Sequence, residues 1–176
     1  VVKEVCENMD SFELGVAAGK IYDFIWDSYC DWYIELTKPR LNGDDEAAKE
    51  SAQRVLLYVL TEILKLLHPF MPFITEELWQ HIYGRKDGES IMMARVTEAT
   101  VSADDEKFIA AFDAAKDVVS GVRTIRNQKN IAQKELLVLQ IVGQNPLENL
   151  SSCIIKMANL SGIDIVSAKD DTAATF

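Results

Sequence analysis

Histidine and cysteine, the residues that most often mark a metal or catalytic centre, are scarce in this chain of 176 residues. It has two histidines and three cysteines, and Cys6, Cys30 and Cys153 do not have the spacing of a metal-binding motif. Free thiols of this kind are typical of a reducing compartment, so we expect a cytoplasmic location. His68 stands beside a proline and His81 on an expected solvent-facing side, so we predict no metal site.

Long apolar runs and glycine-rich phosphate loops are also absent. No apolar run approaches the roughly 20 residues of a membrane span, and the first residues lack the form of a secretory signal, so we expect no membrane partner. The sequence contains neither GxGxxG nor GxxxxGK[ST], and it shows no nucleophile–base pair. We therefore expect no catalytic residue and no cofactor within the chain.

Positive charge is in deficit, with a net charge of −10. The field of the whole molecule would repel phosphate, so any nucleic-acid contact must be local. An acidic helical module that binds a protein partner is an alternative that the charge favours. The hydrophobic content of 48% is sufficient for a core.

An aromatic-rich stretch over residues 21–41 predicts a helix that ends at Lys38-Pro39, because a proline disfavours the α conformation of the residue before it. Acidic residues recur at every fourth position on one side. Ile34 is the apolar exception within that polar arc. The expected core stripe, at three- and four-residue spacing, is Tyr22, Ile25, Trp26, Tyr29, Trp32, Tyr33 and Leu36.

Further helices are predicted over 44–68, 72–83 and 102–128, the last beginning with a capping box of Ser102 and Asp105. We expect Phe70, Phe73, Leu78, Trp79 and Ile82 to give the 72–83 helix its core side. A strand over 135–142, a helix to about residue 159 and a strand over 163–167 follow. The prediction is a mainly α fold: a helical bundle over 1–100, then a long helix with a small C-terminal α/β appendage over 101–176.

Three segments in order resemble the valyl-tRNA synthetases. FIWDSYCDWYIELTKPR (residues 24–40) and LLHPFMPFITEELW (66–79) closely resemble their anticodon-binding domain, and VRTIRNQKNI (122–131) resembles the continuation after the bundle. The second segment is shared in looser form by the leucyl, isoleucyl and methionyl enzymes. The equivalent domain of an isoleucyl or leucyl enzyme therefore remains an alternative.

The resemblance implies a class I aminoacyl-tRNA synthetase that charges its tRNA with valine using ATP. It also implies that the catalytic domain, the editing domain and the first helix of the bundle precede Val1, and that a coiled coil follows the appendage. The 176 residues of this chain alone would then be non-catalytic and would bind no ATP. The expected partner is a valine-specific tRNA, and the expected parent enzyme is a cytoplasmic monomer.

Candidate tRNA-binding residues lie mainly on the aromatic-rich helix. Ile34 is the candidate apolar platform for an anticodon base, with Tyr33 as a stacking neighbour and Lys38 and Arg40 as backbone contacts. Tyr33 could instead be core, and the two cations a solvated helix end. The basic end of the fourth helix offers further tRNA backbone contacts, although the helix dipole alone would favour cations there: Arg123, Arg126 and Lys129.

Overall fold

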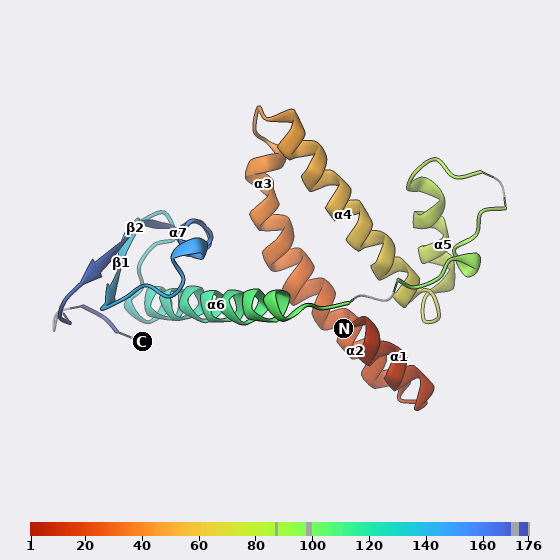
Figure 1. The fold of residues 1–176 in the computed structure, drawn as a ribbon, viewed down its shortest axis with the longest axis horizontal. Helices are drawn as coiled ribbons and strands as arrows, with labels where there is room; N and C mark the ends of the chain where they lie inside the picture. Colours follow the sequence, from red (N-terminus) through yellow and green to blue (C-terminus); the bar gives the residue numbers. More distant parts are fainter. Residues whose placement is uncertain (87, 98–99, 170–172, 176) are drawn as a thin grey trace. The chain divides into compact units, whose positions relative to one another are not determined.

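The computed structural model describes residues 1–86, 88–97, 100–169 and 173–175, and it divides into two compact units, Val1–Thr100 and Val101–Phe176. The first unit is helical, and the second combines a long helix with a two-stranded sheet (Figure 1). This arrangement confirms the predicted mainly α fold with a small α/β appendage. Among the described residues, no helix is both long and apolar enough to cross a membrane.

One long, unbroken helix runs through the first half of the Val1–Thr100 unit. Its central part, η1, is a π-helix of 11 residues, flanked by α2 and α3. The elements of this unit are α1 (Val2–Asp10), α2 (Leu14–Asp23), η1 (Phe24–Ile34), α3 (Glu35–Leu41), α4 (Glu46–Leu67), α5 (Pro72–His81) and the 3-10 helix η2 (Ile91–Met93). Because i→i+5 bonding puts more residues into each turn than an α-helix does, η1 changes which side chains share a face.

The predicted core stripe is wrong at the start of this long helix. Tyr22 and Trp26 are 62% and 52% exposed, because Ala17 and Ile21 form the buried side of α2 and the predicted stripe starts one residue away from it, at Tyr22. Tyr29 is buried, and its hydroxyl donates to the backbone oxygen of Leu56 on α4 at 2.9 Å. The inward side of η1 is therefore fixed by Tyr29.

The predicted helix end at Lys38-Pro39 is also wrong, since α3 continues to Leu41. Pro39 lies in the last turn, where its missing N–H removes one helix hydrogen bond without interrupting a long ladder. The backbone N–H of Asn42 still donates to the Lys38 oxygen at 3.0 Å. The helix therefore carries Lys38 and Arg40 on regular backbone.

The contact between α4 and α5 is centred on Trp79, which packs with Leu64 and Ile91 and is 5% exposed. This confirms the expected burial of Trp79. The expected burial of Phe73 and Leu78 is wrong, with Phe73 89% exposed. Thr75 and Trp79, one turn apart, form the buried side of α5, so the core covers a narrower stripe of α5 than the apolar residues suggest.

The Val101–Phe176 unit is a long helix followed by a β–α–β arrangement. Its elements are α6 (Ala103–Lys129), β1 (Leu137–Val142), the 3-10 helix η3 (Glu148–Leu150), α7 (Ser151–Ala158) and β2 (Leu160–Val166). The strands pair in parallel, with Ile141 opposite Ile165, and such strands need a crossover connection, which η3 and α7 supply. The predicted capping box is present: the amide of Asp105 donates to Ser102 Oγ at 3.2 Å, and the amide of Ser102 donates to Asp105 Oδ2 at 2.9 Å.

Candidate nucleic-acid interface

Ile34 is the last residue of η1 and is partly exposed. Its backbone oxygen accepts a hydrogen bond from the hydroxyl of buried Thr37 at 2.9 Å. The junction between η1 and α3 is thus held by a side-chain contact as well as by the helix. The Ile34 side chain is neither a core residue nor fully solvated, as a platform for an incoming base requires.

Tyr33 is packed against Tyr29, with ring centroids 6.3 Å apart and an angle of 18° between the ring planes. Partial burial raises the pKa of Tyr33 above its ordinary value, and the nearby charge of Arg40 opposes that effect. The phenol therefore stays neutral near pH 7. The contact with Tyr29 places the Tyr33 ring beside the core. Tyr33 directly precedes Ile34 in the sequence.

Lys38 and Arg40 are both exposed on α3. The ammonium of Lys38 lies 2.5 Å from Glu35 Oε1, one turn back on the same helix. That carboxylate neutralises part of the Lys38 charge. Among the described residues, no carboxylate lies within ion-pair distance of Arg40, so Arg40 is the stronger candidate for holding a phosphate.

The cations of α6 have different surroundings from one another. Arg123 and Lys129 are exposed, and Arg123 Nη2 donates to the backbone oxygen of Met157 at 3.2 Å. Arg126 is 1% exposed. Its Nη1 donates to the oxygen of Ala132 at 3.1 Å, and its Nη2 donates to the oxygen of Asn159 at 2.8 Å.

The expectation that Arg126 contacts the tRNA backbone is therefore corrected: its guanidinium is enclosed and bound to carbonyl groups. The reason is its position, four residues after Val122 and seven after Val119, on the buried side of α6. That spacing is visible in the sequence and would have distinguished Arg126 from Arg123 and Lys129.

The histidines take part in local contacts. His68 Nδ1 lies 2.7 Å from Thr75 Oγ1, and Thr75 in turn donates to the Met71 oxygen at 2.8 Å. His81 Nδ1 lies 2.8 Å from the oxygen of Glu77. In the part of the chain that the structure describes, no group of three histidine, cysteine or carboxylate side chains is placed to hold a metal ion.

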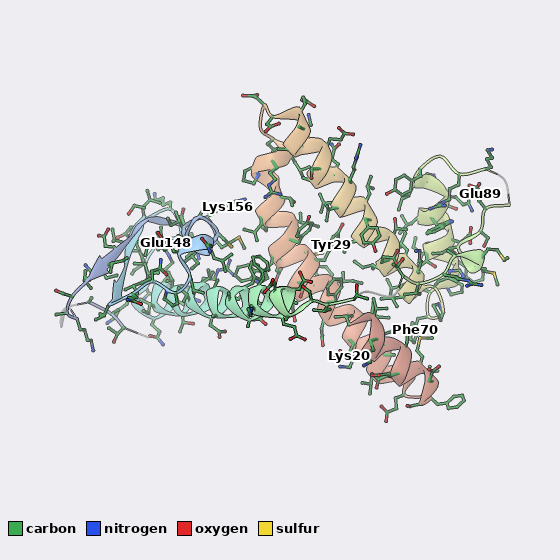
Figure 2. All side chains as sticks on the ribbon, in the orientation of Figure 1. Lys20, Tyr29, Phe70, Glu89, Glu148 and Lys156 are labelled. Atoms are coloured by element: carbon green, nitrogen blue, oxygen red, sulfur yellow. The ribbon has the colours of Figure 1, made fainter. Side chains whose placement is uncertain are left out.

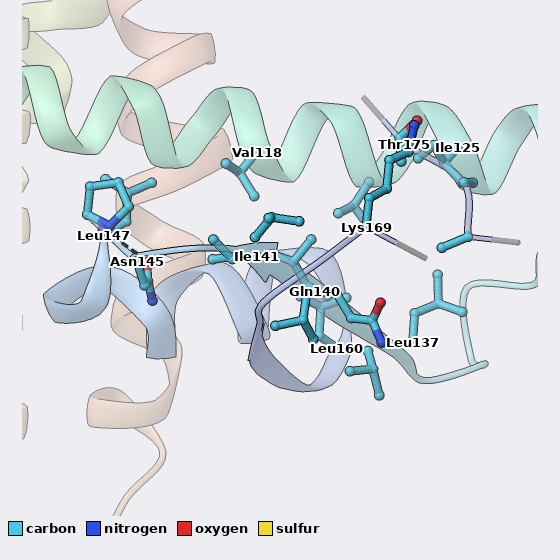
Figure 3. Close-up of a pocket in the computed structure, with 18 of the residues that line it drawn as sticks. Val118, Ile125, Leu137, Gln140, Ile141, Asn145, Leu147, Leu160, Lys169 and Thr175 are labelled. Carbon is cyan, nitrogen blue, oxygen red and sulfur yellow. Dashed lines mark hydrogen bonds between the residues drawn. The ribbon is translucent and has the colours of Figure 1, made fainter. Parts of the chain in front are cut away.

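A cavity of about 800 Å³ lies between α6 and β1 (Figure 3). Val118 and Ile125 of α6 face Leu137 and Ile141 of β1 across it, and Lys169 also lines it. The described residues that line it are mostly aliphatic, and they include no pair of groups for acid–base or nucleophilic chemistry.

Each of the two units thus presents exposed cations at the end of a helix, Lys38 and Arg40 on α3 and Arg123 and Lys129 on α6. The family model described as "Anticodon-binding domain of tRNA ligase" matches residues 1–141. The chain belongs to this family.

Curated relatives agree along nearly the whole chain. It is 45% identical over 174 residues to a valine--tRNA ligase of Phocaeicola vulgatus, with 98% of this chain and 19% of the relative covered. The match to the valine--tRNA ligase of Bacteroides thetaiotaomicron is 42% over 178 residues, covering 100% and 20%. For Bacillus cereus the valine--tRNA ligase match is 38% over 169 residues, covering 93% and 19%. The chain thus spans about a fifth of the length of these relatives.

Proposed function

We propose that this chain is the anticodon-recognition part of a valine–tRNA ligase. It binds the valine tRNA and positions it for ATP-dependent aminoacylation by a catalytic domain outside these residues. The match of the anticodon-binding family model to residues 1–141 carries the proposal, and the valine--tRNA ligases at up to 45% identity support the choice of amino acid. ATP use belongs to the longer enzyme, which acts as a cytoplasmic monomer.

In this proposal the end of the long helix reads the anticodon. Proteins recognise single-stranded RNA loops by splaying out bases and packing them on side chains. Partly exposed Ile34 contacts a base, and Tyr33 stacks beside it, held in place by Tyr29. Arg40 and Lys38 hold phosphates on either side.

Charge limits where the RNA can approach. Asp23, Asp27 and Asp31 are exposed along the same long helix, and like charges would repel a phosphate there. The cations stand beyond them, on α3. The phosphate contacts are accordingly confined to the end of the helix, and Ile34 lies at the boundary between the two parts.

The test is Ile34→Ala in the longer enzyme. Contacts between a base and a side chain are worth roughly 1–3 kcal/mol, so kcat/KM for tRNA should fall by between several-fold and about a hundredfold. Valine activation, measured by ATP–pyrophosphate exchange, should not change. Leu14→Ala is the control, because Leu14 is an exposed aliphatic residue of the same long helix and lies at the end opposite α3.

Two outcomes separate recognition from packing. Ile34→Asp should lower kcat/KM further than Ile34→Ala, because it adds a negative charge beside the acidic stretch. A strong fall in melting temperature with normal charging would show instead that Ile34 is a packing residue, and the assignment of this face to the anticodon would be wrong.

The amino-acid assignment has its own test. The longer enzyme should charge tRNA with valine in preference to isoleucine and leucine. Preferential charging with either of the other two would keep the anticodon-binding role and overturn the valine assignment.

A further inference from the structure

Charge is divided along α6. Its first half is acidic, and the two lysines there are paired within the helix: Lys107 with Asp104 at 3.0 Å and Lys116 with Asp113 at 2.5 Å. From residue 118 to residue 134 the sequence has no acidic residue. The second half of α6 and the turn after it therefore keep their positive charge.

Buried Arg126 joins this basic end to the end of α7. Its two hydrogen bonds reach Ala132, just after α6, and Asn159, the C-cap of α7. The side-chain amide of Asn159 also donates to the oxygen of Gln133. Helix C-termini carry partial negative charge, so one enclosed guanidinium stabilises two of them and fixes α7 against the turn that follows α6.

Three exposed lysines lie on the backbone segments that meet there. Lys129 is in the last turn of α6, and Lys134 follows Gln133 in the turn. Lys156, labelled in Figure 2, is in the last turn of α7. Among the described residues, no carboxylate lies within ion-pair distance of Lys129 or Lys134. Arg126 already supplies a cation to both helix ends, so the dipoles do not account for all of this charge.

We propose that Lys129, Lys134 and Lys156 form a binding surface for the phosphodiester backbone of RNA. This inference rests on the proposed function, because it adds a second tRNA contact to the α3 face. The charge complementarity carries it: the surface is basic on an acidic protein, and lysine binds phosphate as a point charge. Contacts of this kind position an RNA without reading its sequence. Lys134 and Lys156 gain this role through the meeting of α6 and α7, which sequence spacing does not show.

The experiment measures binding of the 176-residue chain to a fluorescently labelled valine tRNA transcript over a series of salt concentrations. Lys129→Gln/Lys134→Gln is compared with Lys107→Gln/Lys116→Gln, which removes the same charge from the acidic half of α6. Each phosphate contact contributes roughly 0.7–0.9 to the slope of log affinity against log salt. The first double variant should lower the magnitude of that slope by about 1.4–1.8 and weaken binding at low salt at least roughly fivefold. The second double variant should change neither the slope nor the affinity. Lys156→Gln should change the slope by about half as much as the first double variant does.

Equal effects of the two double variants would show a general charge effect and would overturn the proposed binding surface. A wild-type chain that does not bind the transcript at low salt would also overturn it. Anticodon changes in the transcript separate this inference from the proposed function. If the lysine effect persists while affinity ignores the anticodon, the surface stands and the anticodon-reading role fails. If affinity follows the anticodon while the lysine effect is absent, the surface alone is wrong.

Discussion

Trp79 is held by polar contacts as well as by packing. Its indole N–H donates to the oxygen of Glu89 at 3.0 Å, and the guanidinium of Arg85 lies 3.4 Å from the ring centroid. Trp26 has a different environment, since it contacts Tyr22 at 6.2 Å between ring centroids and is half exposed. Trp79 and Trp26 should therefore differ in how much their removal lowers the free energy of unfolding.

Trp79→Ala should lower the free energy of unfolding by about 3–5 kcal/mol, because it removes a buried aromatic ring and leaves a cavity. Trp26→Ala should lower it by less than about 1 kcal/mol, since an exposed side chain loses little on truncation. Urea unfolding followed by circular dichroism measures both. Similar losses for the two variants would contradict the difference in burial.

Glu62 ties the chain near Thr97 to α4. Its Oε2 accepts from the Thr97 amide at 3.1 Å, its Oε1 accepts from the Thr97 hydroxyl at 3.0 Å, and Lys65 Nζ lies 2.6 Å from Oε1. Burial alone would raise the pKa of Glu62, but the hydrogen bonds from Lys65 and Thr97 outweigh it and lower the pKa below its ordinary value.

A lowered pKa makes this contribution to stability depend on pH. The stabilisation by ionised Glu62 is fully present above the unfolded value of about 4.3 and is lost as the pH falls through the folded pKa. Glu62→Gln should therefore destabilise the protein most at pH 7, with a difference from wild type that shrinks below about pH 4. Urea unfolding at several pH values tests this, and a difference independent of pH would rule out an ionic role for Glu62.

The sequence predicts the burial of a residue on a helix better than it predicts the contacts that distant loops make with that residue. Trp79 could be predicted as core because it follows a proline corner and lies on a short helix against a strongly apolar one. The Arg85 and Glu89 contacts of Trp79, and the Thr97 contact of Glu62, depend on how loops fold back. No spacing in the sequence carries that information.

At the scale of elements, the start of α6 could be predicted from the sequence because the hydrogen bonds of its capping box join residues only three apart. Ser102 and Asp105 form the predicted box, and Asp45 Oδ1 accepts from the amides of Ala47 and Ala48 at 3.0 and 3.1 Å. The π-helix η1 could not be predicted in this way, because its residue types also suit an α-helix.

Ser102→Ala should destabilise the protein by about 1 kcal/mol, because it removes the acceptor for the Asp105 amide at the start of α6. Ser120→Ala is the control: Ser120 is exposed in the interior of the same helix, where alanine has the higher helix propensity. The free energy of unfolding should fall for the first variant and stay level or rise for the second. A fall of the same size in both would show that the cap contributes nothing.

At the scale of the whole molecule, the chain by itself should not activate valine. It has neither of the glycine-rich phosphate loops sought in the sequence. The purified 176-residue chain should give background ATP–pyrophosphate exchange, with the longer enzyme as the positive control. Exchange that remains through purification and depends on valine would refute this.

The family could be identified from the sequence because three ordered segments carry it. The candidate tRNA-binding residues could only be narrowed to two regions of the sequence. In the sequence Ile34 stood out as an apolar residue within a polar arc, whereas the proposed basic surface at the ends of α6 and α7 depends on a contact between Arg126 and Asn159, 33 residues apart. The spacing of Arg126 from Val119 and Val122 indicates the buried side of α6 already in the sequence, but the contact of Arg126 with Asn159 does not follow from any spacing.

The π-helix has a mechanical consequence for α3. Each residue of an α-helix turns the chain by about 100°, and an i→i+5 turn contains one residue more than an i→i+4 turn. If one turn of η1 changed from i→i+5 to i→i+4 hydrogen bonding, α3 would rotate about the helix axis by about 100° and shift along it by one residue. The packing of α2 in its core would not change. The direction in which Lys38 and Arg40 point thus depends on the hydrogen-bond register between Phe24 and Ile34.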